Sequence, residues 1–232
     1  MPDPQRLDEL RAEIDRLDTL LHDTLMQRAD VVAEVARTKA ASSGAIGTAL
    51  RPDREAAMAK RFAKRHHGPF PIRSLQRIWR EIVNATTQEV QMRFAVHLGT
   101  MDAKARDAAR YTFGDASELV VHDSARAALD AAGGNESDIA ALPVGDGPWW
   151  RDLAERAGVI MRIGDLLVVG PSLALDWDVD LIVTSGDQEG FTTLASAPDG
   201  SRLISGDIAA LDPSAVIRHI GGYMDAPWVG LT

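Results

Sequence analysis

The feature that most constrains this chain is its first long segment, residues 5–41, which contains neither glycine nor proline. Apolar side chains recur there in alternating steps of three and four, at Leu7, Leu10, Ile14, Leu17 and Leu21. This spacing is the period of a long amphipathic α-helix with one apolar stripe. The segment therefore predicts a single helix of about ten turns.

Arg28 lies on this stripe, where the same steps would place an apolar residue. A purely structural interpretation is that its side chain reaches past the stripe to water or pairs with a carboxylate. The alternative is that this part of the helix lines an anion-binding site. Lys39 supports the alternative, because it follows Arg28 by about three turns and so shares its face, about 16 Å away along the axis.

Arg11 and Lys39 lie much farther apart, at a separation of about 42 Å along a straight helix. The two side chains cannot contact the same small molecule within one chain. If both belong to one site, that site must combine two chains whose helices run antiparallel. This arrangement requires a homodimer.

Composition limits the possible partners. Residues 1–92 carry 15 Lys and Arg against 13 Asp and Glu, whereas residues 93–232 carry 10 against 21. Neither part has the strongly basic, aromatic-rich face of a nucleic-acid-binding protein, and the first part favours a small anionic ligand. The chain has no cysteine, no signal-peptide pattern and no apolar run near the length of a membrane span. We therefore expect a cytoplasmic protein without membrane or nucleic-acid partners.

The rest of the chain divides into a helical and a mixed part. Residues 52–67 and 72–91 predict two further helices, so residues 1–92 are expected to form an all-helical domain. From residue 93, short apolar runs alternate with helical segments, which predicts a small parallel sheet followed by a hairpin at Asp199-Gly200. Residues 148–158 and 212–221 predict two late helices. The expected fold class is α + α/β, with a domain 1–92 and a domain 93–232.

Five charged residues of the first part occur in the order and spacing of a known family. The segments LRAEIDRLDTLLHDTLMQRADVVAEVARTK and RPDREAA contain Arg11, Arg28, Lys39, Arg54 and Glu55, and GPF and IWREI follow. Over about residues 7–91 the chain resembles the all-helical chorismate mutases, especially those fused to prephenate dehydratase. The resemblance implies an intertwined three-helix homodimer that rearranges chorismate to prephenate, in the synthesis of phenylalanine and tyrosine, without a cofactor or metal.

The resemblance also implies how the substrate is held. Arg11 of the partner chain and Arg28 bind carboxylates, while Lys39 contacts the ether oxygen and a carboxylate. Glu55 accepts a hydrogen bond from the ring hydroxyl, and the backbone near Arg51 also contacts this hydroxyl. Arginine suits this task because its guanidinium fork binds a carboxylate through two hydrogen bonds.

Arg54 supports the site in that family, although a simple charge pair at a helix start would also explain Arg54 beside Glu55. Thr86 fits a position that holds a small or hydroxylic residue. One turn later the family has Gln or Glu, which donates to the ether oxygen, but this chain has Val90 four residues after Thr86. Either a one-residue slip brings Gln91 to the substrate, or this hydrogen bond is absent. Loss of such a donor typically lowers a rate about 10²- to 10³-fold.

The second part resembles the first lobe of prephenate dehydratase in the segments FAVHLG, AARYTFG and DIAALPV. The Glu-Asn expected next is replaced by PVGDGP, and the Thr-Arg-Phe catalytic motif is absent. We therefore expect a degenerate dehydratase-like domain, whose end could be the remnant of a small regulatory module. The alternating Asp176, Asp178 and Asp180 lack the glycine and glutamate of a calcium loop, and are expected on a solvated strand face.

These observations leave two functions open. The preferred one is a dimeric chorismate mutase. The alternative is a non-catalytic protein with the same helical fold that binds a metabolite or regulates another enzyme, and Val90 favours it. A bifunctional mutase and dehydratase would need the missing Thr-Arg-Phe motif.

Overall fold

The computed structural model describes residues 4–43 and 50–225, except for the side chains of residues 42 and 43. The chain forms two compact units, residues 1–47 and 48–232. Each unit is described by itself. The helical part followed by a mixed sheet with helices has the expected α + α/β fold class.

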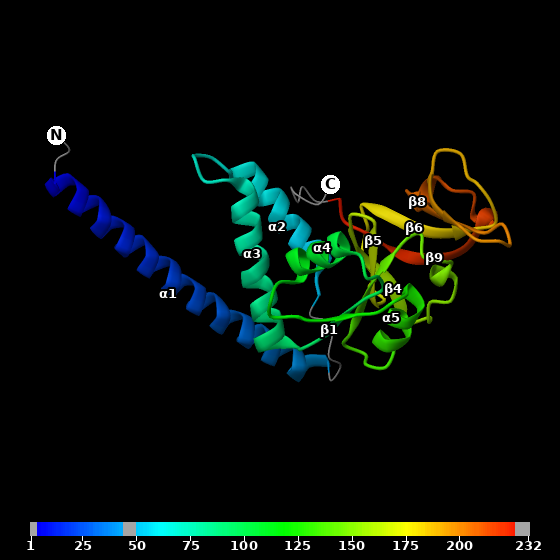
Figure 1. Ribbon diagram of the computed structural model, residues 1–232, viewed down its shortest axis with the longest axis horizontal. Coiled ribbons are helices and arrows are strands. Elements are labelled where there is room, and N and C mark those ends of the chain that lie inside the picture. Colours follow the sequence, from blue (N-terminus) through cyan, green and yellow to red (C-terminus); the bar gives the residue numbers. More distant parts are fainter. Residues whose placement is uncertain (1–3, 44–49, 226–232) are drawn as a thin grey trace. The chain divides into compact units, whose positions relative to one another are not determined.

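The first unit is one helix, α1 (Pro4–Ser43), which confirms the long helix predicted from the apolar period (Figure 1). Salt bridges join neighbouring turns on its surface, for example between Arg16 and Glu13 at 2.8 Å. The apolar stripe is exposed: Leu7, Leu10, Ile14, Leu17 and Leu21 are 43–63% accessible. A single helix has no core of its own in which to bury such a stripe. Among the described helices, none is both long and apolar enough to cross a membrane.

The second unit begins with a helical hairpin. Helix α2 (Pro52–Arg65) has proline in its first turn and basic residues in its last, as the sequence predicts. Helix α3 (Ile72–Thr86) continues directly into a π-helical turn, Thr87–Gln91. Phe62 of α2 and Trp79 of α3 form an edge-to-face ring contact, with centroids 4.8 Å apart. This contact joins the two helices.

A nine-stranded sheet follows within residues 50–225, in the order β2-β1-β3-β5-β4-β9-β6-β8-β7. Its strands are β1 (Ala95–Leu98), β2 (Glu118–Val121), β3 (Ile139–Pro143), β4 (Ala157–Ile163), β5 (Leu166–Pro171), β6 (Val179–Thr184), β7 (Thr192–Ser196), β8 (Arg202–Gly206) and β9 (Val216–Tyr223). The first three strands pair in parallel, as expected from the β-α-β-α-β pattern. Strands β7 and β8 form the antiparallel hairpin predicted at Asp199-Gly200.

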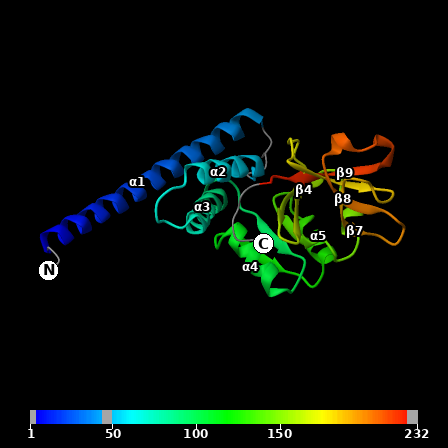
Figure 2. The same ribbon diagram turned by 90° about the horizontal axis from the view of Figure 1, so that it is seen from above.

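Helices α4 (Ala103–Phe113) and α5 (Ala125–Ala132) cover opposite faces of the sheet. Alternate residues of β3 divide between the two cores: Ile139 and Ala141 pack in the cluster that holds Phe113 of α4, whereas Ala140 and Leu142 pack with α5. Helix α3 lies beside α4 in both views (Figures 1 and 2). The hairpin of α2 and α3 is thus joined to the sheet through α4.

The prediction of a helix at residues 148–158 is wrong. Only one 3₁₀ turn, Trp149–Arg151, forms there. Trp150 is completely buried and the Trp149 indole donates to the carbonyl of Pro143 at 2.9 Å, so both rings serve the core of the sheet. From Ala157 the chain is extended, because it pairs with β5.

The last helix, predicted at residues 212–221, is also wrong. Asp212 does cap a turn, but this is a single 3₁₀ turn, Pro213–Ala215, and Val216–Tyr223 form strand β9. Gly221 has a φ of +106° and passes so close to β4 that a Cβ atom would overlap the carbonyl of Val159. The helix that suggested a remnant regulatory module is therefore a strand that joins the two parts of the sheet.

Candidate functional site

Helix α1 carries three of the predicted site residues, Arg11, Arg28 and Lys39. It has no break between Pro4 and Ser43, so Arg11 and Lys39 remain about 42 Å apart along the axis. The Arg11 guanidinium is exposed and contacts Asp8 at 3.3 Å on the preceding turn. An exposed pair of this kind is weak, which leaves Arg11 able to change partners.

The start of α2 holds the next group. The Arg51 guanidinium binds Asp53 through two hydrogen bonds, of 3.0 and 2.6 Å, and its backbone carbonyl accepts from the amide of Glu55 at 3.0 Å. The hydrogen bonds from Arg51 lower the pKa of Asp53. Arg54 is exposed on the other side of the turn. The Arg51–Asp53 pair was not predicted from the sequence. It lies at the start of α2, directly before Glu55.

Glu55 is the predicted site residue with the most unusual environment. Burial raises the pKa of its carboxyl. The positive charge of Arg80 lowers this pKa, and the negative charge of Asp53 raises it further. Arg80, on α3, is 5% exposed, and burial lowers the pKa of its guanidinium while Glu55 and Tyr111 raise it. A carboxyl whose pKa is shifted by burial and by a nearby arginine is a candidate functional group.

The raised pKa has a consequence for stability. The folded chain retains the Glu55 proton to a higher pH than the unfolded chain, so stability is lost as the pH rises through that interval. We expect Glu55→Gln, which mimics the protonated form, to be more stable than the wild type at pH 7. The difference should shrink as the pH falls towards the ordinary carboxyl pKa of about 4.3. Urea unfolding at a series of pH values measures this.

Asp53→Asn is the matched control, because the pKa of Asp53 is lowered and the sign is therefore reversed. This variant should be less stable than the wild type at pH 7, and the deficit should disappear as the pH falls through the lowered pKa. Equal effects of the two substitutions would contradict the burial of the Glu55 charge.

The C-terminal end of α3 holds the last of the predicted site residues. The Thr86 hydroxyl donates back to the helix, 2.7 Å from the carbonyl of Ile82. Beyond it, Val90 and Gln91 are partly exposed in the π-helical turn. The structure thus places Thr86 and Gln91 close together in the chain at the C-terminal end of α3.

The buried face of α3 is not the one that its apolar residues suggest. Ile78 is 48% exposed, whereas Gln76, Arg80 and Asn84 are buried. Asn84 donates to the carbonyl of Thr112 at 2.8 Å, near the C-terminus of α4 where helix carbonyls lack intrahelical partners. The signal that could have revealed this face is the recurrence of long polar side chains every four residues, since Gln88 continues the series.

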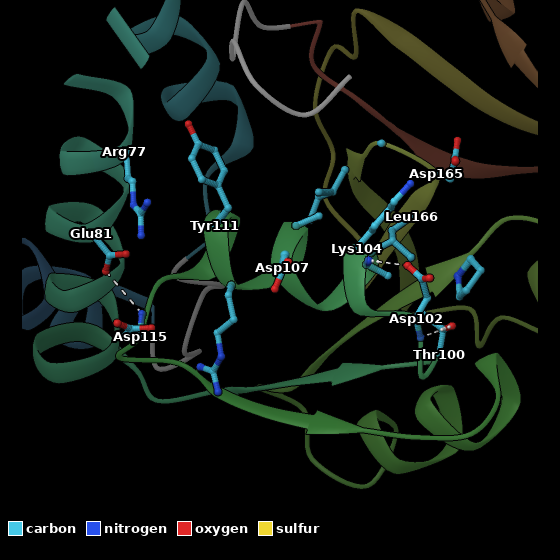
Figure 3. Close-up of a pocket in the computed structure, with 16 residues that line it drawn as sticks. Arg77, Glu81, Thr100, Asp102, Lys104, Asp107, Tyr111, Asp115, Asp165 and Leu166 are labelled. Atoms are coloured by element: carbon cyan, nitrogen blue, oxygen red, sulfur yellow. Dashed lines mark hydrogen bonds between the residues drawn. The ribbon is translucent and has the colours of Figure 1, made fainter. Parts of the chain in front are cut away.

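A separate cavity of about 880 Å³ lies between α3, α4 and the turn before β5 (Figure 3). Arg77 and Glu81 of α3 border it at one end, and Lys104 and Asp165 at the other. Within this described cavity, none of the eight predicted site residues is part of the lining. The cavity is therefore distinct from the predicted site residues.

Comparison with known proteins relates the helical part of the chain to a known family. Residues 10–91 match the family model of chorismate mutase type II. A bifunctional chorismate mutase/prephenate dehydratase from Stutzerimonas stutzeri is 33% identical over 116 residues, which cover 49% of this chain and 32% of that protein. The Pseudomonas aeruginosa protein of the same name is 31% identical over 118 residues, with 50% and 32% covered.

The matched region thus spans about a third of the length of these relatives. At most nine residues precede the family-model match, so an alignment of this length also includes residues beyond 91. The similarity continues into the start of the sheet. Residues 10–91 of this chain are a domain of the chorismate mutase type II family.

Proposed function

We propose that this protein is a chorismate mutase, which converts chorismate to prephenate within a homodimer. The observation that carries the proposal is that all eight predicted site residues, from Arg11 to Gln91, fall inside the family match of residues 10–91. The boundary at residues 92 and 93 stays a prediction, since α2 and α3 belong to the same compact unit as the sheet.

The chemistry suits these residue types. The rearrangement breaks an ether C–O bond and forms a C–C bond within one molecule, so it needs neither a nucleophile nor proton transfer. Catalysis consists of holding the substrate in its compact conformation and stabilising negative charge on the ether oxygen. Arg28 and the partner's Arg11 bind the two carboxylates, Lys39 approaches the ether oxygen, and Glu55 accepts the ring hydroxyl. Arg51 and Arg54 support Glu55 from the start of α2.

The dimer is part of the same proposal. The exposed apolar stripe of α1 needs a partner, and Arg11 is too far from Lys39 to serve the same site. A second α1 running antiparallel satisfies both needs at once, because it covers the stripe and places its own Arg11 near the first chain's Lys39.

One assay tests the proposal. Purified protein should consume chorismate and form prephenate far faster than the uncatalysed reaction, and it should form no phenylpyruvate. Absence of turnover above the uncatalysed rate would refute the mutase. Tight binding of chorismate without turnover would instead support the non-catalytic metabolite-binding protein, the alternative that Val90 favours. Phenylpyruvate would show that the second domain is an active dehydratase.

A further inference from the structure

The third helix changes its geometry at the place where its sequence departs from the expected pattern. After Thr86 the chain forms a π-helical turn, closed by the amide of Met92, which donates to the carbonyl of Thr87 at 2.9 Å. This is a hydrogen bond over five residues instead of four. Such turns usually insert one extra residue into a helix, and they are frequent at functional sites.

The extra residue changes which side chain follows Thr86. In an α-helix the residue one turn later would be Val90, the fourth along. In a π-helical turn each ring contains one more residue, so Gln91, the fifth along, returns towards the face of Thr86. Among the described residues, the Gln91 side-chain amide makes no hydrogen bond, and it is partly exposed. The turn therefore performs the one-residue slip that would give the ether oxygen a donor.

Gln88 holds this turn to the second part of the chain. Its side chain is buried, at 4% residue exposure. The amide oxygen accepts from the backbone N–H of Phe94 at 3.2 Å, and the amide nitrogen donates to the Phe94 carbonyl at 3.0 Å and to the Ser117 hydroxyl at 2.9 Å. Phe94 fixes the orientation of the amide, because its N–H can only donate and its carbonyl can only accept.

Ser117 is itself held in place. Its hydroxyl donates to the carbonyl of Phe113 at 2.8 Å, and its carbonyl accepts from Arg110 at 2.8 Å. The π-helical turn is thus tied to the residue before β1 and to the end of α4. All polar atoms of the Gln88 amide are engaged in these bonds, so Gln88 itself is not available to a substrate.

We propose that Gln88 is a positioning residue for Gln91. By tying the π-helical turn to Phe94 and Ser117, it keeps the amide of Gln91 on the substrate side of the helix, so the α/β domain helps to build the mutase site. This inference rests on the proposed mutase function. It gives residues 93–232 a role in catalysis that requires no chemistry of their own.

The rival interpretation is that Gln88 only stabilises the junction between α3 and the sheet. Asn84 separates the two interpretations. Like Gln88 it is buried, one turn earlier on α3. It donates to the carbonyl of Thr112 in α4, but it lies outside the π-helical turn. A purely structural role predicts similar effects of Gln88→Met and Asn84→Leu.

The test compares these variants with Gln91→Leu as full-length proteins. Gln88→Met should lower kcat about 10²-fold, the scale expected for a misplaced catalytic group, with a much smaller change in KM. Asn84→Leu should keep kcat near the wild-type value below its melting temperature. The double variant Gln88→Met/Gln91→Leu should have the kcat of Gln91→Leu alone, because both substitutions remove the same contact. Multiplying effects in the double variant would overturn the proposal, as would an equal loss in Asn84→Leu.

Two further measurements complete the test. If Gln88→Met does not fold, Ser117→Ala removes one of the three bonds, and it should lower kcat several-fold in the wild type but not in Gln91→Leu. Hydrogen exchange of the Met92 amide should be faster in Gln88→Met and unchanged in Asn84→Leu, independent of activity. An unchanged Met92 rate in Gln88→Met would overturn the proposal. If the wild-type protein shows no turnover, the proposed mutase function itself is refuted. If the wild type is active and only the variant results disagree, the role of Gln88 alone is refuted.

Discussion

Lys39→Ala is expected to abolish measurable chorismate turnover while leaving the dimer intact. The ammonium group is the one charge assigned to the ether oxygen, where negative charge grows as the C–O bond breaks. Removing one such group typically costs about 10²- to 10³-fold in kcat, and the loss of a carboxylate contact should weaken binding as well. The measurement is the steady-state rate of chorismate loss, together with the molecular mass in solution.

Arg37→Ala provides the matched control. Arg37 lies two residues away on the same helix, is exposed, and its nearest described carboxylate is that of Glu34 at 4.0 Å. Such a pair contributes little, so this variant should keep wild-type kinetics. Near-normal turnover of Lys39→Ala would refute the role of Lys39. An equal loss in Arg37→Ala would show that the helix surface as a whole, and not one ammonium group, is responsible.

Local patterns were sufficient where local interactions decide the structure. The long run without glycine or proline correctly predicts α1. The proline and acidic residues at 52–55 correctly predict the start of α2. Asp199-Gly200 gave the hairpin of β7 and β8. In each case the residues that determine the conformation are neighbours in the sequence.

Pairing between distant residues explains the two wrong helices. Asp212 begins a turn, as its capping preference predicts, but residues from Val216 pair with β6, more than thirty residues earlier. The run 148–158 has a helical pattern, yet Trp149 and Trp150 bury their rings against the sheet and the chain beyond them joins β5. Strand formation depends on such non-local partners more than on intrinsic preference.

The candidate site divides in the same way. The eight residues could be chosen from the resemblance to a known family. Arg80, whose charge lowers the pKa of Glu55, could not, because it lies on α3 and nothing in the sequence near Glu55 indicates it. The π-helical turn was equally out of reach. Its residue Gln88 bonds to Ser117, 29 residues away in the sequence. The sequence could state two alternatives for Val90 and Gln91, and only the backbone geometry favours one of them.

Mixing an Arg11→Ala chain with a Lys39→Ala chain is expected to restore activity that neither variant shows alone. In the proposed dimer each site takes Lys39 from one chain and Arg11 from the other. A mixed dimer therefore has one site with both substitutions and one site with neither. Random exchange makes half of the dimers mixed, so the mixture should recover about a quarter of the wild-type turnover per chain.

The predicted recovery follows from the length of α1. If Arg11 served the site of its own chain, it would have to approach Lys39 across about 42 Å of uninterrupted helix. Both sites of a mixed dimer would then carry one substitution, and no activity would return. The Arg37→Ala chain mixed with Lys39→Ala controls for dilution, since its unmodified sites should remain active in proportion to their number. Mixed dimers that form, as shown by mass spectrometry, but stay inactive would therefore remove Arg11 of the partner from the site, whatever the role of Lys39.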